Sequence, residues 1–121
     1  MQKLRNRLLA SLLLILLPLS VTASSVNTAQ EIKHLFNFII ASDCIFIRNN
    51  TEYTASEARD HMQRKYDYAR RWIDNAEQFI NRIASKSSMS GNRYQVRCQN
   101  QLLYSDNWLR QELQHYRNSR H

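Results

Sequence analysis

Glu57, His61 and Lys65 have the types and spacing that come closest to a reactive site in this 121-residue chain. They stand four positions apart, so a helix would place all three on one face. A glutamate–histidine pair can transfer protons or bind a metal. Two candidate ligands are too few for a closed zinc site, and the second histidine of a His-Glu-x-x-His motif is missing. We therefore interpret the three as solvated neighbours on a helix, and predict no metal site and no cofactor.

A second candidate follows the apolar run Cys44–Ile47, where Arg48, Asn49 and Asn50 come in succession. Asparagine enters left-handed backbone conformations more readily than most residues, so the two asparagines predict a turn. Arg48 could anchor that turn through hydrogen bonds to carbonyl or carboxylate groups, or it could point outward and recognise a partner. We expect the structural role.

Ser87, Ser88 and Ser90 are the candidates for a nucleophile, but no histidine or lysine stands at a spacing that would activate a serine. Lys86 adjoins them, and adjacent residues on a helix do not share a face. We assign no catalytic residue and expect no enzymatic activity.

The first 23 residues have the pattern of a secretory signal peptide. Lys3, Arg5 and Arg7 give a positive start, an apolar run extends from Leu8 to Val21, and Ala23 precedes the expected cut. The apolar run is too short for a comfortable membrane span, and no cysteine follows it that could carry a lipid. An uncleaved anchor is the alternative. We expect residues 1–23 to be removed, so that residues 24–121 form a single small helical domain that does not span a membrane.

Cleavage would leave a moderately basic protein, because it removes three of the 17 basic residues and leaves 14 against 10 acidic ones, a net charge of +4. Eleven of these 14 are arginines, which favour bidentate contacts with carboxylates or phosphates. Export excludes nucleic acid as a partner, so the available targets are acidic partner proteins, lipid headgroups and cell-wall carboxylates. The other interpretation is a solvated basic face without a partner.

Helical periodicity dominates the rest of the sequence. Helices are predicted to begin at Thr28, Thr54 and Ser105. The helical spacing after Thr54 continues for about 30 residues, but Asp74 adds a further start signal inside it. We therefore predict two helices, about 55–73 and 76–86, or one helix with a sharp bend.

Two short strands, Cys44–Ile47 and Tyr94–Cys98, complete the predicted fold. In an oxidising compartment an even pair of cysteines indicates a disulfide, with two buried thiols or a redox pair as alternatives. If Cys44 and Cys98 are bonded and the strands pair, the strands are antiparallel, with residue 44 opposite 98 and 48 opposite 94. The predicted fold class is α+β, mostly α, with three or four helices and a short two-stranded antiparallel β pair tied by a disulfide.

The blocks CIFIRNN, ASKSSMSGN and WLRQELQHYR resemble the YfeK-like family of small secreted bacterial proteins, a domain of unknown function. The resemblance extends from about Ile32 to Arg117 and implies a periplasmic location in a Gram-negative envelope. Family members usually carry glycine after the Arg-Asn pair, where this chain has Asn50. The family brings no established activity, so the resemblance implies no catalytic residue.

Three classes of function remain open on this basis. The first is a non-enzymatic periplasmic accessory or binding module. The second is an inhibitor or immunity-type protein that binds an envelope enzyme, and a hydrolase comes last. The expected partner is an envelope protein or an acidic cell-wall or lipid ligand.

Overall fold

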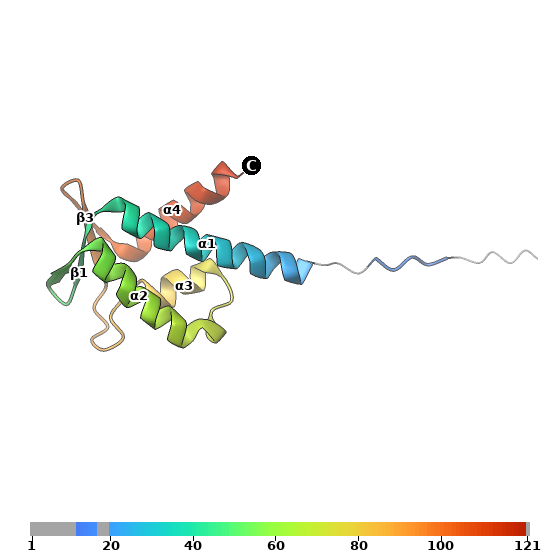
Figure 1. The fold of residues 1–121 in the computed structure, drawn as a ribbon, viewed down its shortest axis with the longest axis horizontal. Helices are drawn as coiled ribbons and strands as arrows, with labels where there is room; N and C mark the ends of the chain where they lie inside the picture. Colours follow the sequence, from blue (N-terminus) through green and yellow to red (C-terminus); the bar gives the residue numbers. More distant parts are fainter. Residues whose placement is uncertain (1–11, 17–19, 121) are drawn as a thin grey trace, which may run out of the picture.

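The computed structural model describes residues 12–16 and 20–120, and this described part holds four α-helices and four β-strands (Figure 1). In chain order the elements are α1 (Ser20–Ser42), β1 (Ile45–Arg48), β2 (Thr51–Tyr53), α2 (Ala55–Ala69), the 3-10 helix η1 (Arg70–Trp72), α3 (Ala76–Ile83), β3 (Gln95–Cys98), β4 (Gln101–Tyr104) and α4 (Ser105–Ser119). The same unit of helix, hairpin and helix occurs twice in succession. The fold class predicted from the sequence, α+β and mostly helical, is confirmed.

The strands form one antiparallel sheet in the order β2-β1-β3-β4. Its centre is the predicted pair, since β1 and β3 are antiparallel with Ile45 opposite Arg97 and Ile47 opposite Gln95. The same register brings residue 44 opposite residue 98, as the disulfide argument requires. The outer strands β2 and β4 were not predicted, so the sheet is wider than the two-stranded pair.

Each half of the sheet is a hairpin with a two-residue turn. Asn49 and Asn50 have φ values of 50° and 65°, and Gln99 and Asn100 have φ values of 50° and 67°. Two consecutive positive φ values are those of a type I′ turn, whose twist matches that of the paired strands. The two asparagines thus adopt the left-handed conformation expected for a turn after Arg48.

A disulfide joins Cys44, just before β1, to Cys98 at the end of β3, with a Cα–Cα distance of 5.0 Å. These are the two cysteines of the chain, so the alternative of two free thiols does not apply. The bond closes a sequence separation of 54 residues across the two central strands.

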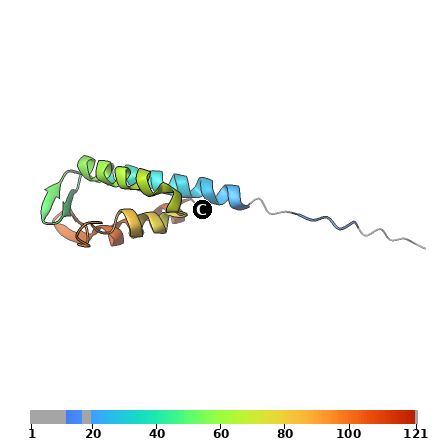
Figure 2. The ribbon, with the colours of Figure 1, turned by 90° about the horizontal axis from the view of Figure 1, so that it is seen from below.

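The helices cover one face of the sheet, which lies at one end of the helical body (Figure 1). Figure 2 shows α1 and α2 side by side in one layer, with α3 and α4 below them. Phe46 of β1 and Val96 of β3 are buried against the helices. The largest side chains at the centre of the core come from three helices: Leu35, Ile39, Phe79, Ile80, Ile83, Leu109 and Leu113.

The stretch after Thr54 forms two helices, as predicted. Thr54 and Glu57 make the expected capping box, in which the Thr54 amide donates to Glu57 Oε1 at 2.9 Å and the Glu57 amide donates to Thr54 Oγ1 at 3.1 Å. The cap of α3 is Asn75 and not Asp74, because the Gln78 amide donates to Asn75 Oδ1 at 2.8 Å.

The first helix begins at Ser20, so the predicted start at Thr28 is wrong. No proline or glycine lies between these residues to end the helix, so the helix continues upstream of Thr28. The predicted signal peptide lies mostly outside the described residues, which exclude 1–11 and 17–19. None of the helices in the described ranges is both long and apolar enough to cross a membrane.

Candidate functional site

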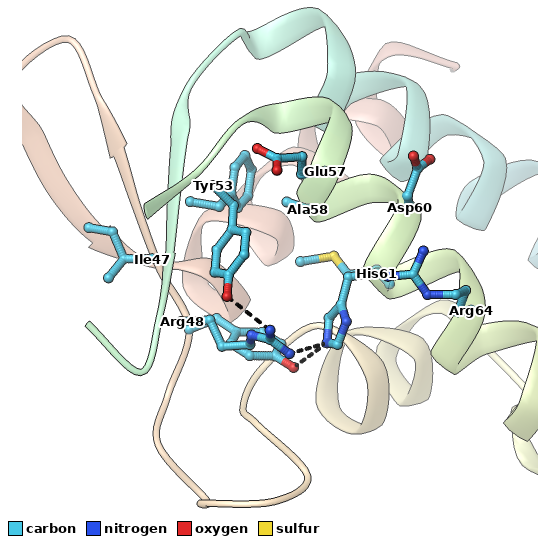
Figure 3. A pocket seen from close by; sticks show the side chains of 11 residues that line it. Ile47, Arg48, Tyr53, Glu57, Ala58, Asp60, His61 and Arg64 are labelled. Carbon is cyan, nitrogen blue, oxygen red and sulfur yellow. Dashed lines mark hydrogen bonds between the residues drawn. The ribbon is translucent and has the colours of Figure 1, made fainter. Parts of the chain in front are cut away.

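Arg48 ends strand β1 with its side chain directed toward α2 (Figure 3). Side chains alternate along a strand, so Arg48 lies on the same helix-covered face as Phe46, which is buried in the core. Arg48 Nη2 donates to Tyr53 Oη at 3.0 Å, and the guanidinium lies 5.0 Å from the centre of the Tyr53 ring. Arg48 Nη1 donates to His61 Nε2 at 3.2 Å.

His61 and Lys65 project from α2 one turn apart, and both meet the phenol of Tyr94, which lies just before β3. His61 Nε2 is 3.3 Å from Tyr94 Oη, and Lys65 Nζ donates to the same oxygen at 3.2 Å. Lys65 Nζ also donates to the carbonyl oxygen of Lys86 at 3.2 Å. The fold therefore brings Arg48 of the β1–β2 hairpin together with two basic side chains of α2, His61 and Lys65.

A cavity of about 240 Å³ opens beside this cluster, between the β1–β2 hairpin and α2. We call it the Arg48 cavity. Its walls include buried apolar side chains as well as the polar groups of the cluster (Figure 3). The principal lining residues are Phe46, Arg48, Tyr53, His61, Met62 and Tyr94.

The basic groups of the cluster have no acidic partners of their own. In the part of the chain that the structure describes, neither Arg48 nor Lys65 forms an ion pair with a carboxylate. By contrast, Arg97 on β3 pairs with Glu52 at 2.9 Å. A guanidinium has five N–H donors, and the hydrogen bonds to Tyr53 and His61 occupy two of them. Arg48 thus retains donors for an anion in the cavity.

The electrostatic environment holds His61 neutral. Burial lowers the pKa of His61, and the charges of Arg48, Lys65 and Arg64 lower it further. A guanidinium can only donate, so His61 Nε2 accepts the hydrogen bond from Arg48 and the imidazole proton resides on Nδ1. Burial raises the pKa of Tyr94, and its phenol therefore keeps its proton at neutral pH. Burial also lowers the pKa of Lys65, with Arg48 adding to the effect.

We expect the imidazole of His61 to titrate below 6.5, its ordinary pKa, when it is followed by NMR from pH about 5 to 8. The folded protein then binds fewer protons than the unfolded chain. The contribution of His61 to stability is present above pH 6.5 and is lost as the pH falls through the folded pKa. In an Arg48→Ala variant the pKa of His61 should rise, because one of the nearby positive charges is gone. A wild-type pKa at or above the ordinary value would contradict this electrostatic description.

The other residues singled out in the sequence lie around the cluster rather than in it. Glu57 lines the Arg48 cavity but is exposed and serves as part of the α2 cap. Asn49 accepts hydrogen bonds from Ser90 Oγ at 2.6 Å and Asn92 Nδ2 at 3.0 Å, which tie the hairpin turn to the loop of residues 87–92. Asn50 is exposed in the turn. The side-chain hydrogen bonds of Arg48 go to a phenol and an imidazole instead of the turn carbonyls.

Tyr53 and Tyr94 complete the cluster and were missed in the sequence. Tyr53 lies opposite Phe46 in the pairing of β1 with β2. Its place beside Arg48 could not be predicted because β2 was not predicted. For Tyr94 a signal existed, because the predicted register of the central strands already set residue 94 opposite Arg48. Aromatic residues beside a half-buried arginine are common recognition partners for it.

The chemistry of this arrangement favours anions over metals. Within residues 12–16 and 20–120, no three histidine, cysteine, aspartate or glutamate side chains are grouped so that they could hold a metal ion. The positively charged hydrogen-bond donors Arg48 and Lys65 meet there instead, on either side of His61 and Tyr94. Such donors bind carboxylate or phosphate oxygens, and an arginine makes charge-assisted hydrogen bonds to either.

Comparison with known proteins agrees with the resemblance seen in the sequence. The chain is 34% identical over 92 residues to the uncharacterised protein YfeK of Salmonella typhimurium, an alignment that covers 74% of this chain and 76% of that protein. No solved structure matches the chain. Residues 26–117, which include all the side chains of the Arg48 cavity, match the model of the family of unknown function DUF5329. The chain therefore belongs to the DUF5329 family.

Proposed function

We propose that this protein is an exported, non-enzymatic binding module of the bacterial envelope, and that the Arg48 cavity takes an anionic group of its ligand. The signal-peptide pattern of residues 1–23 supports export. The disulfide between Cys44 and Cys98 agrees with an oxidising compartment such as the periplasm.

The observation that carries the proposal is that Arg48 lines a concave site with Lys65 close by, and that neither forms an ion pair with a carboxylate of the described residues. Partly desolvated charges are costly unless they are paired, so a basic cluster of this kind is completed by an anion from outside the chain. Arg48 is oriented for this role, because Tyr53 stacks against its guanidinium and His61 accepts one of its N–H groups. Tyr94 Oη accepts from Lys65 Nζ and lies 3.3 Å from His61 Nε2, so the phenol holds both side chains in place beside the cavity.

A monocarboxylate with an apolar side chain tests the proposal directly. We expect N-acetyl-L-leucine to bind the disulfide-intact protein and to shift the NMR signals of Arg48, His61 and Tyr94. Arg48→Ala should weaken this binding about tenfold to hundredfold, which corresponds to the loss of roughly 1.5–3 kcal/mol from a hydrogen bond to a charged group. Dissociation constants from the NMR titration measure the change.

Arg97→Ala is the matched control, because Arg97 is a strand arginine that pairs with Glu52 and does not line the cavity. It should leave the binding of N-acetyl-L-leucine unchanged. Urea unfolding of both variants identifies any loss of folded protein. Equal binding by wild type and a folded Arg48→Ala variant would contradict the proposed function, and so would the absence of binding to the wild type.

The loop of residues 87–92 favours a second candidate, an inhibitor or immunity-type protein that binds an envelope enzyme. Met89 at its tip is 96% exposed. Ser87 Oγ holds the loop in shape by accepting hydrogen bonds from the amides of Met89 and Ser90 at 3.3 Å. Asn49 adds a further bond by accepting from Ser90 Oγ. A fixed loop that presents one apolar side chain suits insertion into the cleft of an enzyme. A stoichiometric enzyme complex that depends on Met89 and not on Arg48 would favour this function.

A further inference from the structure

The charged residues that line the Arg48 cavity are Arg48, Arg64, Glu57 and Asp60. Arg48 and His61 lie on one side of it, close to Tyr94. The carboxylates of Glu57 and Asp60 lie on the other side, one turn apart on α2 (Figure 3). The cavity therefore presents the Arg48 guanidinium at one end and two carboxylates at the other, with the exposed Arg64 about one turn beyond Asp60 on α2.

The acidic end remains open to a ligand. Oε1 of Glu57 accepts the Thr54 amide, and the described residues offer no hydrogen bond to its Oε2. Asp60 is half-exposed and meets only Arg59, at 3.5 Å, among the described basic side chains. The hydrogen bond from the Thr54 amide lowers the pKa of Glu57, so this carboxylate is ionised at neutral pH.

Between the two ends the wall is apolar. Phe46, Ala58 and Met62 line the cavity and are 3%, 8% and 2% exposed. They form a surface on which a small aliphatic or aromatic group can pack. The cavity volume of about 240 Å³ is below the range of about 300–1,000 Å³ that is typical of drug-sized ligands. Its size is therefore that of one amino acid or the end of a short peptide.

We propose that the ligand of the Arg48 cavity is a small zwitterion of amino-acid size, with its carboxylate at Arg48, its ammonium group toward Glu57 and Asp60, and its side chain against Met62. This inference rests on the proposed function, since it assigns the same site to a narrower class of ligand. A dianion such as phosphate fits less well, because the two carboxylates repel a second negative charge. A ligand with a positive charge alone would leave Arg48 without a partner and be repelled by it.

Three compounds that share the leucine side chain distinguish these possibilities. L-Leucine is the zwitterion, N-acetyl-L-leucine is the anion and L-leucinamide is the cation. We expect NMR titration of the full, disulfide-bonded protein to show that L-leucine binds about three- to tenfold more tightly than N-acetyl-L-leucine, a gain of the size expected from exposed ion pairs. L-Leucinamide should show no saturable binding. The binding of L-leucine should also exceed that of inorganic phosphate.

The variant Glu57→Gln combined with Asp60→Asn is the matched test, because glutamine also serves in a capping box and α2 should stay intact. It should reduce the affinity for L-leucine to that for N-acetyl-L-leucine. Equal affinity of the wild type for these two compounds, or tighter binding of phosphate, would overturn the zwitterion assignment and leave the anion-binding function standing. Failure of all the anionic compounds to bind would overturn both.

Discussion

Replacing both Cys44 and Cys98 by serine is expected to lower the free energy of unfolding by about 2–5 kcal/mol, the usual effect of removing a native disulfide from a small domain. The disulfide closes a sequence separation of 54 residues, for which the chain-entropy relation gives about 4 kcal/mol. It also fastens the two central strands to each other at the end away from Arg48. Urea unfolding of the double variant and of the oxidised wild type measures the difference.

Reduced wild-type protein is the control, because it lacks the same covalent bond but keeps both sulfur atoms. Its unfolding midpoint should agree with that of the double variant. If the double variant were as stable as the oxidised protein, the disulfide would not contribute to the stability of the native fold. The double replacement also avoids the lone thiol that a single replacement would leave free to form bonds between molecules.

The central part of the fold could be predicted because a covalent bond and local patterns agreed. The two cysteines required an antiparallel pair with residue 44 opposite 98, and the structure has this register. The Thr54 capping box is a local hydrogen-bond pattern that needs no tertiary contact, and it marked the start of α2 correctly. Local signals of this kind can be recognised in a single sequence.

The outer strands could not be predicted in the same way. β2 has three residues and β4 has four, and neither shows a clear alternation of polar and apolar side chains. Their conformation follows from the type I′ turns that precede them and from pairing with β1 and β3. A turn with Gln99 in the left-handed region has no strong sequence signal, since glycine, asparagine and aspartate are the residues typical of it.

The candidate site could be predicted from the sequence only in part. The spacing of His61 and Lys65 placed both on one helix face, but no pattern in the sequence indicated that Arg48 would lie beside them. Their meeting depends on how α2 packs against the β1–β2 hairpin, which is a tertiary contact. Tyr94 joins them from 33 residues beyond His61. The burial of His61 and Lys65 and their lowered pKa values follow from that packing. Neither could be derived from the spacing of these residues in the sequence.

Arg117 illustrates a second long-range contact that the sequence did not reveal. From α4 its guanidinium donates twice to Glu31 of α1, at 2.6 and 2.9 Å, and once to Glu77 of α3, at 2.6 Å. These hydrogen bonds raise the pKa of Arg117 and lower that of Glu77. The side chain of Glu31 is only 12% exposed, so its charge depends on Arg117 for compensation. One arginine thereby ties three helices together.

Arg117→Met is expected to lower the free energy of unfolding by about 2–3 kcal/mol. Breaking a fully buried ion pair costs about 3–5 kcal/mol, and the loss should be smaller here because the Arg117 side chain is 31% exposed. The cost arises mainly because Glu31 is left charged and poorly solvated. Adding Glu31→Gln should therefore recover part of the loss, so the two changes should not be additive. Arg70→Met is the matched control, since Arg70 and Asp67 are 64% and 56% exposed and such a pair contributes less than about 1 kcal/mol. Equal losses in the Arg117 and Arg70 variants by urea unfolding would show that Arg117 acts as an ordinary surface charge.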